Sequence, residues 1–122
     1  MRIVVDTGVF YHPEALARLA ERPQDIVVPV VALAERLRQV RRDGLDVAAF
    51  RRTLVRAHVD VEAMGEPEAT SVATAALDDD VWRKLSHDAF IAGHVQPGDE
   101  LWTTNPEDFE ALGVPRERIV RV

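Results

Sequence analysis

The most informative segment of the chain is MRIVVDTG, residues 1–8, in which an apolar run ends at an acidic residue and a turn. Ile3, Val4 and Val5 are consecutive β-branched residues, a pattern typical of a strand buried on both faces. Asp6-Thr7-Gly8 then provides the polar and flexible residues of a turn. We therefore predict a buried strand over residues 3–5 that ends at a carboxylate.

The rest of the chain alternates between apolar residues at helical spacing and short apolar runs typical of buried strands. This alternation predicts an α/β fold, a sandwich in which helices flank a mainly parallel sheet, as a single domain over residues 1–122. We expect Ser86 to cap the fifth helix, with Trp82 in a turn before it. The predicted helices follow Pro13 and cover about residues 29–42, 47–56, 66–77 and 86–95, with a short one after Asn105; the predicted strands cover residues 26–28, 59–61, 101–104 and 119–122.

Composition limits the class of protein. The chain has 122 residues, of which 47% are hydrophobic, enough for one domain with a substantial core. It has no cysteine, which excludes disulfides, thiolate metal sites and cysteine nucleophiles. No run approaches the roughly 20 apolar residues of a membrane span, and a carboxylate follows MRIVV where a signal peptide would continue its apolar region. We expect a cytoplasmic protein without membrane contact.

Charge is distributed unevenly. The net charge of −6 argues against a protein that coats nucleic acid through bulk electrostatics. Residues 36–56, however, contain seven arginines against two acidic residues. We favour a solvated helical face as the explanation of this run, although the same arginines could hold phosphates or an acidic partner.

Acidic residues gather at one predicted edge of the sheet. Ligands of an open parallel sheet bind beyond the carboxyl ends of its strands. Asp6 ends the first strand and Asn105 follows the fourth, so Asp6, Asn105 and Asp108 share a crevice if those strands are neighbours. Asp88, in the first turn of its predicted helix, can also point there. Carboxylates in one pocket raise one another's pKa unless a cation compensates, and hard divalent cations with oxygen ligands suit this role.

Each of these acids also has a structural interpretation. Asp6 could cap a helix, but Pro13 places the helix start several residues later, so we favour a functional role. Asp88 suits a helix dipole as well as a site, and Asp108 alone fits the third position of a helix better than a site. Glu35 lies opposite the apolar stripe of its helix, which fits either solvent, the commoner case, or a wet cleft.

The order and spacing of four segments add more than any one residue. VVDTGVF, PVVALAERL, HDAFIAG and TTNPEDF, in this order, resemble the signature segments of PIN-domain proteins, especially the compact VapC-like toxins. The family pattern is Asp-Thr after the first strand, Leu-Ala-Glu in the second helix, Asp-Ala-x-Ile-Ala, and Thr-x-Asn-x-x-Asp-Phe. The resemblance covers nearly the whole chain. No single segment is specific, but the ordered set is.

The resemblance implies a three-layer α/β/α sandwich with a mainly parallel sheet of four or five strands. It also implies an acidic cleft and Mg²⁺- or Mn²⁺-dependent endonuclease activity on RNA. It implies that Asp6, Glu35, Asp88 and Asp108 ligate the metal ions, directly or through water. It implies that Thr7 and Asn105 orient those carboxylates or the attacking water. A VapC-like toxin would also have a small antitoxin protein as partner and form homodimers. Two departures, His87 before Asp88 and Gly93-His94 on the same helix, leave the depth of the cleft open.

Two other functions remain open. The chain could be a PIN-like fold without catalysis that binds protein or RNA, although it keeps all four acids. It could instead be a receiver or a dehalogenase-like phosphatase, but those families use a second aspartate near the first and a lysine near the site. Here Gly8 stands close after Asp6, where those families have the second aspartate. The sole lysine, Lys84, lies in the segment of Trp82, away from the predicted site. We expect the histidines, including His87 and His94, to serve surface or core packing.

Overall fold

The computed structural model describes residues 1–22, 24–74 and 78–122. Within these ranges one sheet contains five strands in the order β3-β2-β1-β4-β5, and every pair of neighbours is parallel. The predicted α/β fold with a parallel sheet is therefore confirmed. The strands are β1 (Arg2–Val5), β2 (Asp25–Pro29), β3 (Val59–Glu62), β4 (Glu100–Thr103) and β5 (Ile119–Arg121).

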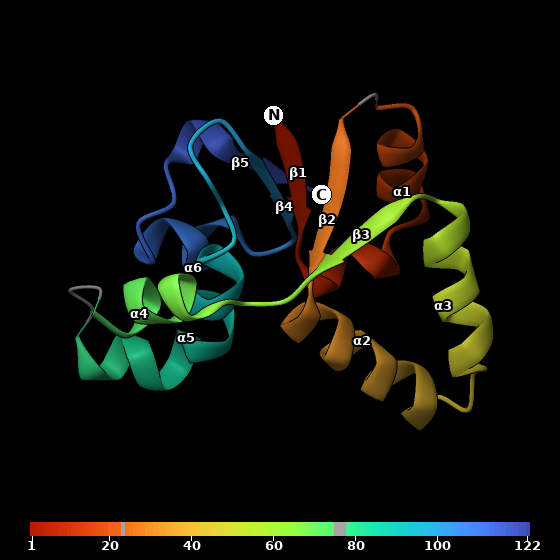
Figure 1. The fold of residues 1–122 in the computed structure, drawn as a ribbon, viewed down its shortest axis with the longest axis horizontal. Helices are drawn as coiled ribbons and strands as arrows, with labels where there is room; N and C mark the ends of the chain where they lie inside the picture. Colours follow the sequence, from red (N-terminus) through yellow and green to blue (C-terminus); the bar gives the residue numbers. More distant parts are fainter. Residues whose placement is uncertain (23, 75–77) are drawn as a thin grey trace.

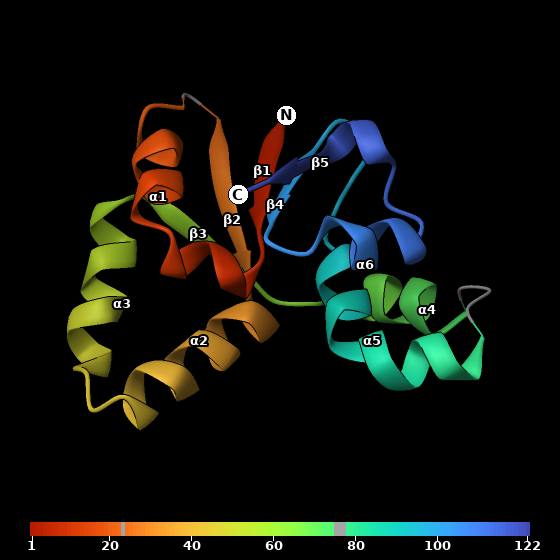
Figure 2. The same ribbon diagram turned by 180° about the vertical axis from the view of Figure 1, so that it is seen from behind.

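Helices lie between the strands and cover the sheet. Figures 1 and 2 show α1, α2 and α3 on one side of the sheet and α4, α5 and α6 on the other. Parallel neighbours require long crossover connections, and these helices provide them. The α-helices are α1 (Pro13–Ala20), α2 (Val30–Arg42), α3 (Val47–Arg56), α4 (Glu66–Thr74), α5 (Asp79–Ala92) and α6 (Pro106–Ala111); η1 (Thr7–Tyr11) and η2 (Arg116–Arg118) are 3₁₀ helices.

The strand order reverses between β1 and β4. From β1 the chain builds outward through β2 and β3, then returns to place β4 and β5 on the other side of β1. Val5 pairs with Trp102, and the backbone N of Asp6 donates to the carbonyl O of Trp102 at 3.0 Å. The chain segments that follow β1 and β4 therefore leave the sheet side by side. Such a reversal is where open α/β sheets form ligand sites.

The core explains why β1 is apolar throughout. Ile3, Val4 and Val5 are buried on both faces of the sheet because helices cover each face. Trp102 and Phe109 pack into the same cluster from β4 and α6. This buried cluster positions the ends of β1 and β4.

The helix that carries Asp88 begins earlier than predicted. Its first residue is Asp79, and the side chain of Asp78 caps it by accepting from the backbone N of Val81 at 2.8 Å. The prediction that Ser86 caps this helix was wrong, because Ser86 lies inside α5. Trp82 is likewise helical rather than in a turn. Leu85 has non-helical torsion angles (φ −120°, ψ 16°) and kinks the helix, so the prediction found only its second part.

Smaller differences concern other helices. The segment after β1 that was predicted as a turn is the 3₁₀ helix η1. In α2 the buried residues are Ala32 and Val40, whereas Val30, at the start of the helix, is exposed. The helix predicted over residues 66–77 is α4 up to Thr74, and its last three positions lie outside the described residues. Among the helices that the structure describes, none is long and apolar enough to span a membrane.

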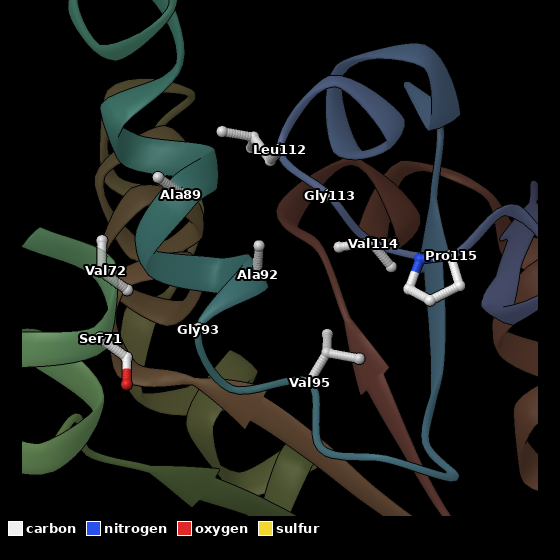
Figure 3. Close-up of a pocket in the computed structure, with 10 residues that line it drawn as sticks. All are labelled: Ser71, Val72, Ala89, Ala92, Gly93, Val95, Leu112, Gly113, Val114 and Pro115. Atoms are coloured by element: carbon white, nitrogen blue, oxygen red, sulfur yellow. The ribbon is translucent and has the colours of Figure 1, made fainter. Parts of the chain in front are cut away.

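Small residues let α5 pack closely against its neighbours. Ala89, Ala92 and Gly93 face Val72 of α4 and Val114 beyond α6 around a pocket of about 220 Å³ (Figure 3). A β-carbon at Gly93 would lie 2.6 Å from Cγ2 of Val72, so the glycine permits this approach. The residues labelled in Figure 3 carry no charged group. This pocket is apolar and does not offer the groups that acid–base or metal chemistry needs.

Candidate metal centre

A polar pocket of about 160 Å³ opens beyond the carboxyl ends of β1 and β4, where the strand order reverses. Three of the four predicted acids line it: Asp6 after β1, Glu35 on α2 and Asp88 on α5. Segments far apart in the sequence are thus brought to one place. The full lining is Asp6, Thr7, Gly8, Tyr11, Glu35, Gln39, Asp88, Thr104 and Asn105.

Asp6 is the most buried of these acids, with only 5% of its surface exposed. Its Oδ1 accepts from the backbone N of Thr7 at 2.7 Å, and its Oδ2 accepts from Oγ1 of Thr103 at 2.8 Å. Burial raises the pKa of Asp6, and the charge of Glu35 adds to this, while the two hydrogen bonds oppose it. Asp6 does act as a cap, but of the helix η1 rather than of α1.

Glu35 turns toward the pocket and is held from two sides. Oγ1 of Thr7 lies 3.0 Å from Oε2 of Glu35, and Nε2 of His87 lies 2.8 Å from the same oxygen. Glu35 is therefore connected to η1 and to α5. The prediction assigned His87 only to packing and did not foresee this contact. The available signal was its position directly before Asp88.

Asp88 has the most perturbed carboxyl group in the pocket. Burial, followed by the charges of Asp6 and Asp108, raises its pKa to about 6. A carboxyl group with such a pKa is one that the protein alone stabilises poorly when it is ionised. A bound cation would remove that penalty.

The two predicted site residues at the start of α6, Asn105 and Asp108, differ in their position relative to the pocket. Asn105 lines the pocket, and it precedes α6 as its N-cap residue without a capping hydrogen bond from its side chain. Asp108 occupies the first turn of α6, as predicted, and is not among the lining residues. Its charge nevertheless contributes to the raised pKa of Asp88. Asp108 thus acts on the pocket through its charge and not as a lining residue.

Gly8 allows the two loops at the reversal point to approach each other. A β-carbon at this position would lie 2.6 Å from Oγ1 of Thr104, closer than real β-carbon contacts. A side chain at residue 8 would require the side chain of Thr104 to shift. Glycine here allows close contact between residue 8 and Thr104, which both line the pocket.

The donor set fits a hard divalent cation. Its candidate ligands are carboxylate oxygens, with hydroxyl and amide oxygens beside them, and Mg²⁺ and Mn²⁺ prefer such ligands. In residues 1–22, 24–74 and 78–122, no three histidine, aspartate or glutamate side chains converge closely enough to hold an ion as they stand. The acids share a pocket and a negative field, and one oxygen of Glu35 is already engaged by Thr7 and His87.

Comparison of the chain with models of known protein families and with curated proteins finds no match. The function of the pocket is therefore inferred from the geometry and chemistry of its residues.

We expect Asp88→Asn to stabilise the metal-free protein at alkaline pH. Because the pKa of Asp88 is about 6 in the folded state against an ordinary 3.8, the folded protein holds this proton more tightly than the unfolded chain does. The stability that Asp88 contributes is therefore present below about pH 4 and is lost as the pH rises through about 6. In EDTA, the melting temperature of the variant should exceed that of the wild type at pH 8 and approach it at acidic pH.

Asp79→Asn is the matched control for this measurement. Asp79 lies on the same helix and is exposed, so its replacement should give no gain at either pH. An Asp88→Asn protein that melts at or below the wild-type temperature at pH 8 would show that the pocket does not disfavour the ionised carboxylate.

Proposed function

We propose that this chain is an endoribonuclease that uses Mg²⁺ or Mn²⁺ held by Asp6, Glu35 and Asp88, with Asp108 ligating directly or through water. The observation that carries the proposal is the meeting of three acids from distant segments in one pocket where the strand order reverses. The raised pKa of Asp88 supports it, because the pocket favours added positive charge. The ordered motifs that resemble those of PIN-domain nucleases support RNA as the substrate.

A divalent ion in this pocket would supply an activated water and stabilise charge on the phosphate, so no cysteine or lysine is required. The side chains around the ion have distinct tasks in this proposal. Thr103 orients Asp6, and Thr7 orients Glu35, through the hydrogen bonds described above. The amide of Asn105 is placed to hold a water or a phosphate oxygen at the rim. Exposed arginines of α2 and α3 would hold the flanking RNA backbone.

The motif resemblance extends the proposal to the biological setting. We propose a cytoplasmic toxin that acts as a homodimer and is inhibited by a small antitoxin protein. An apolar cavity of about 400 Å³ lies beneath α1 and α3, with Leu16 and Phe50 among its lining residues. A partner that covers this side of the molecule would bury apolar surface there.

The test of the proposed activity is a digest of single-stranded RNA with and without metal. We expect cleavage in Mg²⁺ or Mn²⁺, and loss of cleavage in EDTA that is reversed when metal is restored. The new ends should lack a 2′,3′-cyclic phosphate, since water rather than the RNA's own 2′-hydroxyl is the nucleophile. Metal-independent cleavage, or cyclic phosphate ends, would reject the mechanism.

A non-catalytic binding module is the second candidate. It is favoured by the absence, in the described part of the chain, of three acids that already converge on one point, and by the pairing of Glu35 with His87. The two functions differ in metal affinity. Saturable binding of Mn²⁺ in a calorimetric titration, lost in Asp88→Asn, supports the nuclease, whereas no binding at millimolar metal supports the module.

A further inference from the structure

A half-exposed aromatic ring lies at the rim of the candidate metal centre. Tyr11, the last residue of η1, lines the same pocket as Asp6, Glu35 and Asp88, and 48% of its surface is exposed. Aromatic side chains provide large flat contact areas, and the rest of this pocket is mostly polar. The ring thus offers a ligand a kind of contact that the carboxylates cannot provide.

Helix α2 holds this ring in place. Cζ of Arg36 lies 4.3 Å from the centroid of the Tyr11 ring, and the Tyr11 hydroxyl donates to Oε1 of Gln39. Arg36 also lies 5.6 Å from the ring centroid of Phe50. In the described chain, its Nε and Nη1 are buried without a hydrogen-bond partner, while its guanidinium lies over the two rings. The guanidinium lies over the Tyr11 ring, and about half of the Tyr11 surface stays exposed and available to a ligand.

Arg36 therefore differs from the other six arginines of residues 36–56. Those six are exposed, which agrees with the solvated face predicted for the run. Arg36 is half-buried and directed at aromatic rings instead of solvent. Its place behind Tyr11 is more costly than a surface position, because two of its donors are unsatisfied. A function that depends on the orientation of the Tyr11 ring would explain why this energetic cost is tolerated.

From this arrangement we propose that Tyr11 is a stacking platform for a nucleobase of single-stranded RNA, next to the phosphate at the candidate metal centre. This inference rests on the proposed function. Unpaired bases stack on aromatic side chains in RNA recognition, and every base has a face that can do so. Gln39 lies in the same pocket beside the ring and can donate from its amide nitrogen to the edge of the stacked base.

The test is a double-mutant cycle that combines a change of Tyr11 with the removal of single bases from the RNA. Wild-type protein and Tyr11→Leu would be assayed on an RNA oligonucleotide and on matched oligonucleotides that lack one base at a time near the cut. For the wild type, removal of the stacked base should lower kcat/KM by about 5- to 150-fold, the range for a base–aromatic stack. Tyr11→Leu should show this loss on intact RNA and little further loss on the abasic RNA, because both changes remove one contact. Tyr11→Phe keeps the ring and most of the activity.

A measurement on the unaltered protein guards against misfolding of the variant. An RNA with 2-aminopurine at the coupled position should lose fluorescence on binding to the wild type, since stacking quenches this base. Tyr11→Leu activity equal to wild type, or reduced by the same factor on intact and abasic RNA, would overturn the stacking inference and leave the nuclease intact. Failure of the wild type to cleave any RNA in Mn²⁺ would instead reject the proposed function itself.

Discussion

Asp6→Asn is expected to lower RNA cleavage by more than about 100-fold and to leave the fold intact. Loss of an outer-shell partner of a metal ligand already costs about 10- to 100-fold in metal affinity or activity, and Asp6 is proposed as a ligand itself. The variant should fold because asparagine has the same shape. Its Oδ1 can accept from the backbone N of Thr7, and its Nδ2 can donate to Oγ1 of Thr103. Removing a buried charge also removes the penalty that raises the pKa of Asp6.

The measurement is the single-turnover rate of RNA cleavage at saturating Mn²⁺, with circular dichroism to verify the fold. Asp60→Asn is the matched control, because Asp60 is exposed on β3 and carries the same charge away from the pocket. We expect the control to cleave at the wild-type rate. Full activity in a folded Asp6→Asn protein would reject the assignment of the metal centre.

The sequence was most informative where local and long-range preferences agree. The apolar run of β1 predicts a strand buried on both faces, and the alternation of strands and helices along the chain predicts a parallel sheet flanked by helices. A parallel order with neighbouring first and fourth strands then places Asp6 and Asn105 at one edge. The structure confirms that neighbourhood and brings Glu35 and Asp88 to the same pocket.

The sequence was least informative where a single residue has two plausible environments. Glu35 fitted solvent or a cleft equally well on a helical wheel, and only its contacts with Thr7 and His87 settle which side it faces. The early start of α5 was missed because Leu85 interrupts the helical periodicity. Arg36 looked like any other member of an arginine run, since its stacking on Tyr11 depends on how η1 packs against α2.

The largest effect on stability is expected from Arg2, a residue without a distinctive sequence pattern. Its side chain donates to Oε2 of Glu62 at 2.6 Å, to Oδ2 of Asp99 at 2.9 Å and to the carbonyl O of His94 at 2.9 Å. One guanidinium thus joins β1 to β3 and to the segment between α5 and β4. His94 is buried, and its Nδ1 lies 2.8 Å from Oε1 of Glu62, a contact that the prediction of surface or core packing did not include.

Arg2→Met is expected to lower the free energy of unfolding by about 3 kcal/mol at pH 7, because it leaves the buried carboxylate of Asp99 without its cation. The melting temperature should fall by about 10 °C. Burial acts to raise the pKa of Asp99, but hydrogen bonds from Arg2 and the backbone hold it below its ordinary value. Burial likewise opposes the lowering of the Glu62 pKa, and hydrogen bonds from His94 and Arg2 outweigh it. Stability from lowered acid pKa values is present above the unfolded values and lost as the pH falls. The difference between variant and wild type should therefore shrink below about pH 4.

Arg42→Met separates this network from a general effect of removing an arginine. The Arg42 side chain is 71% exposed and lies 3.9 Å from Asp43, an arrangement worth about 0–1 kcal/mol. We expect the melting temperature of Arg42→Met to stay near that of the wild type.

In the double variant Arg2→Met/Asp99→Asn, part of the stability lost in Arg2→Met should be recovered, because the uncompensated buried charge is gone. A single variant Arg2→Met that melts like Arg42→Met would show that β1, β3 and the segment between α5 and β4 are held together without this ion pair.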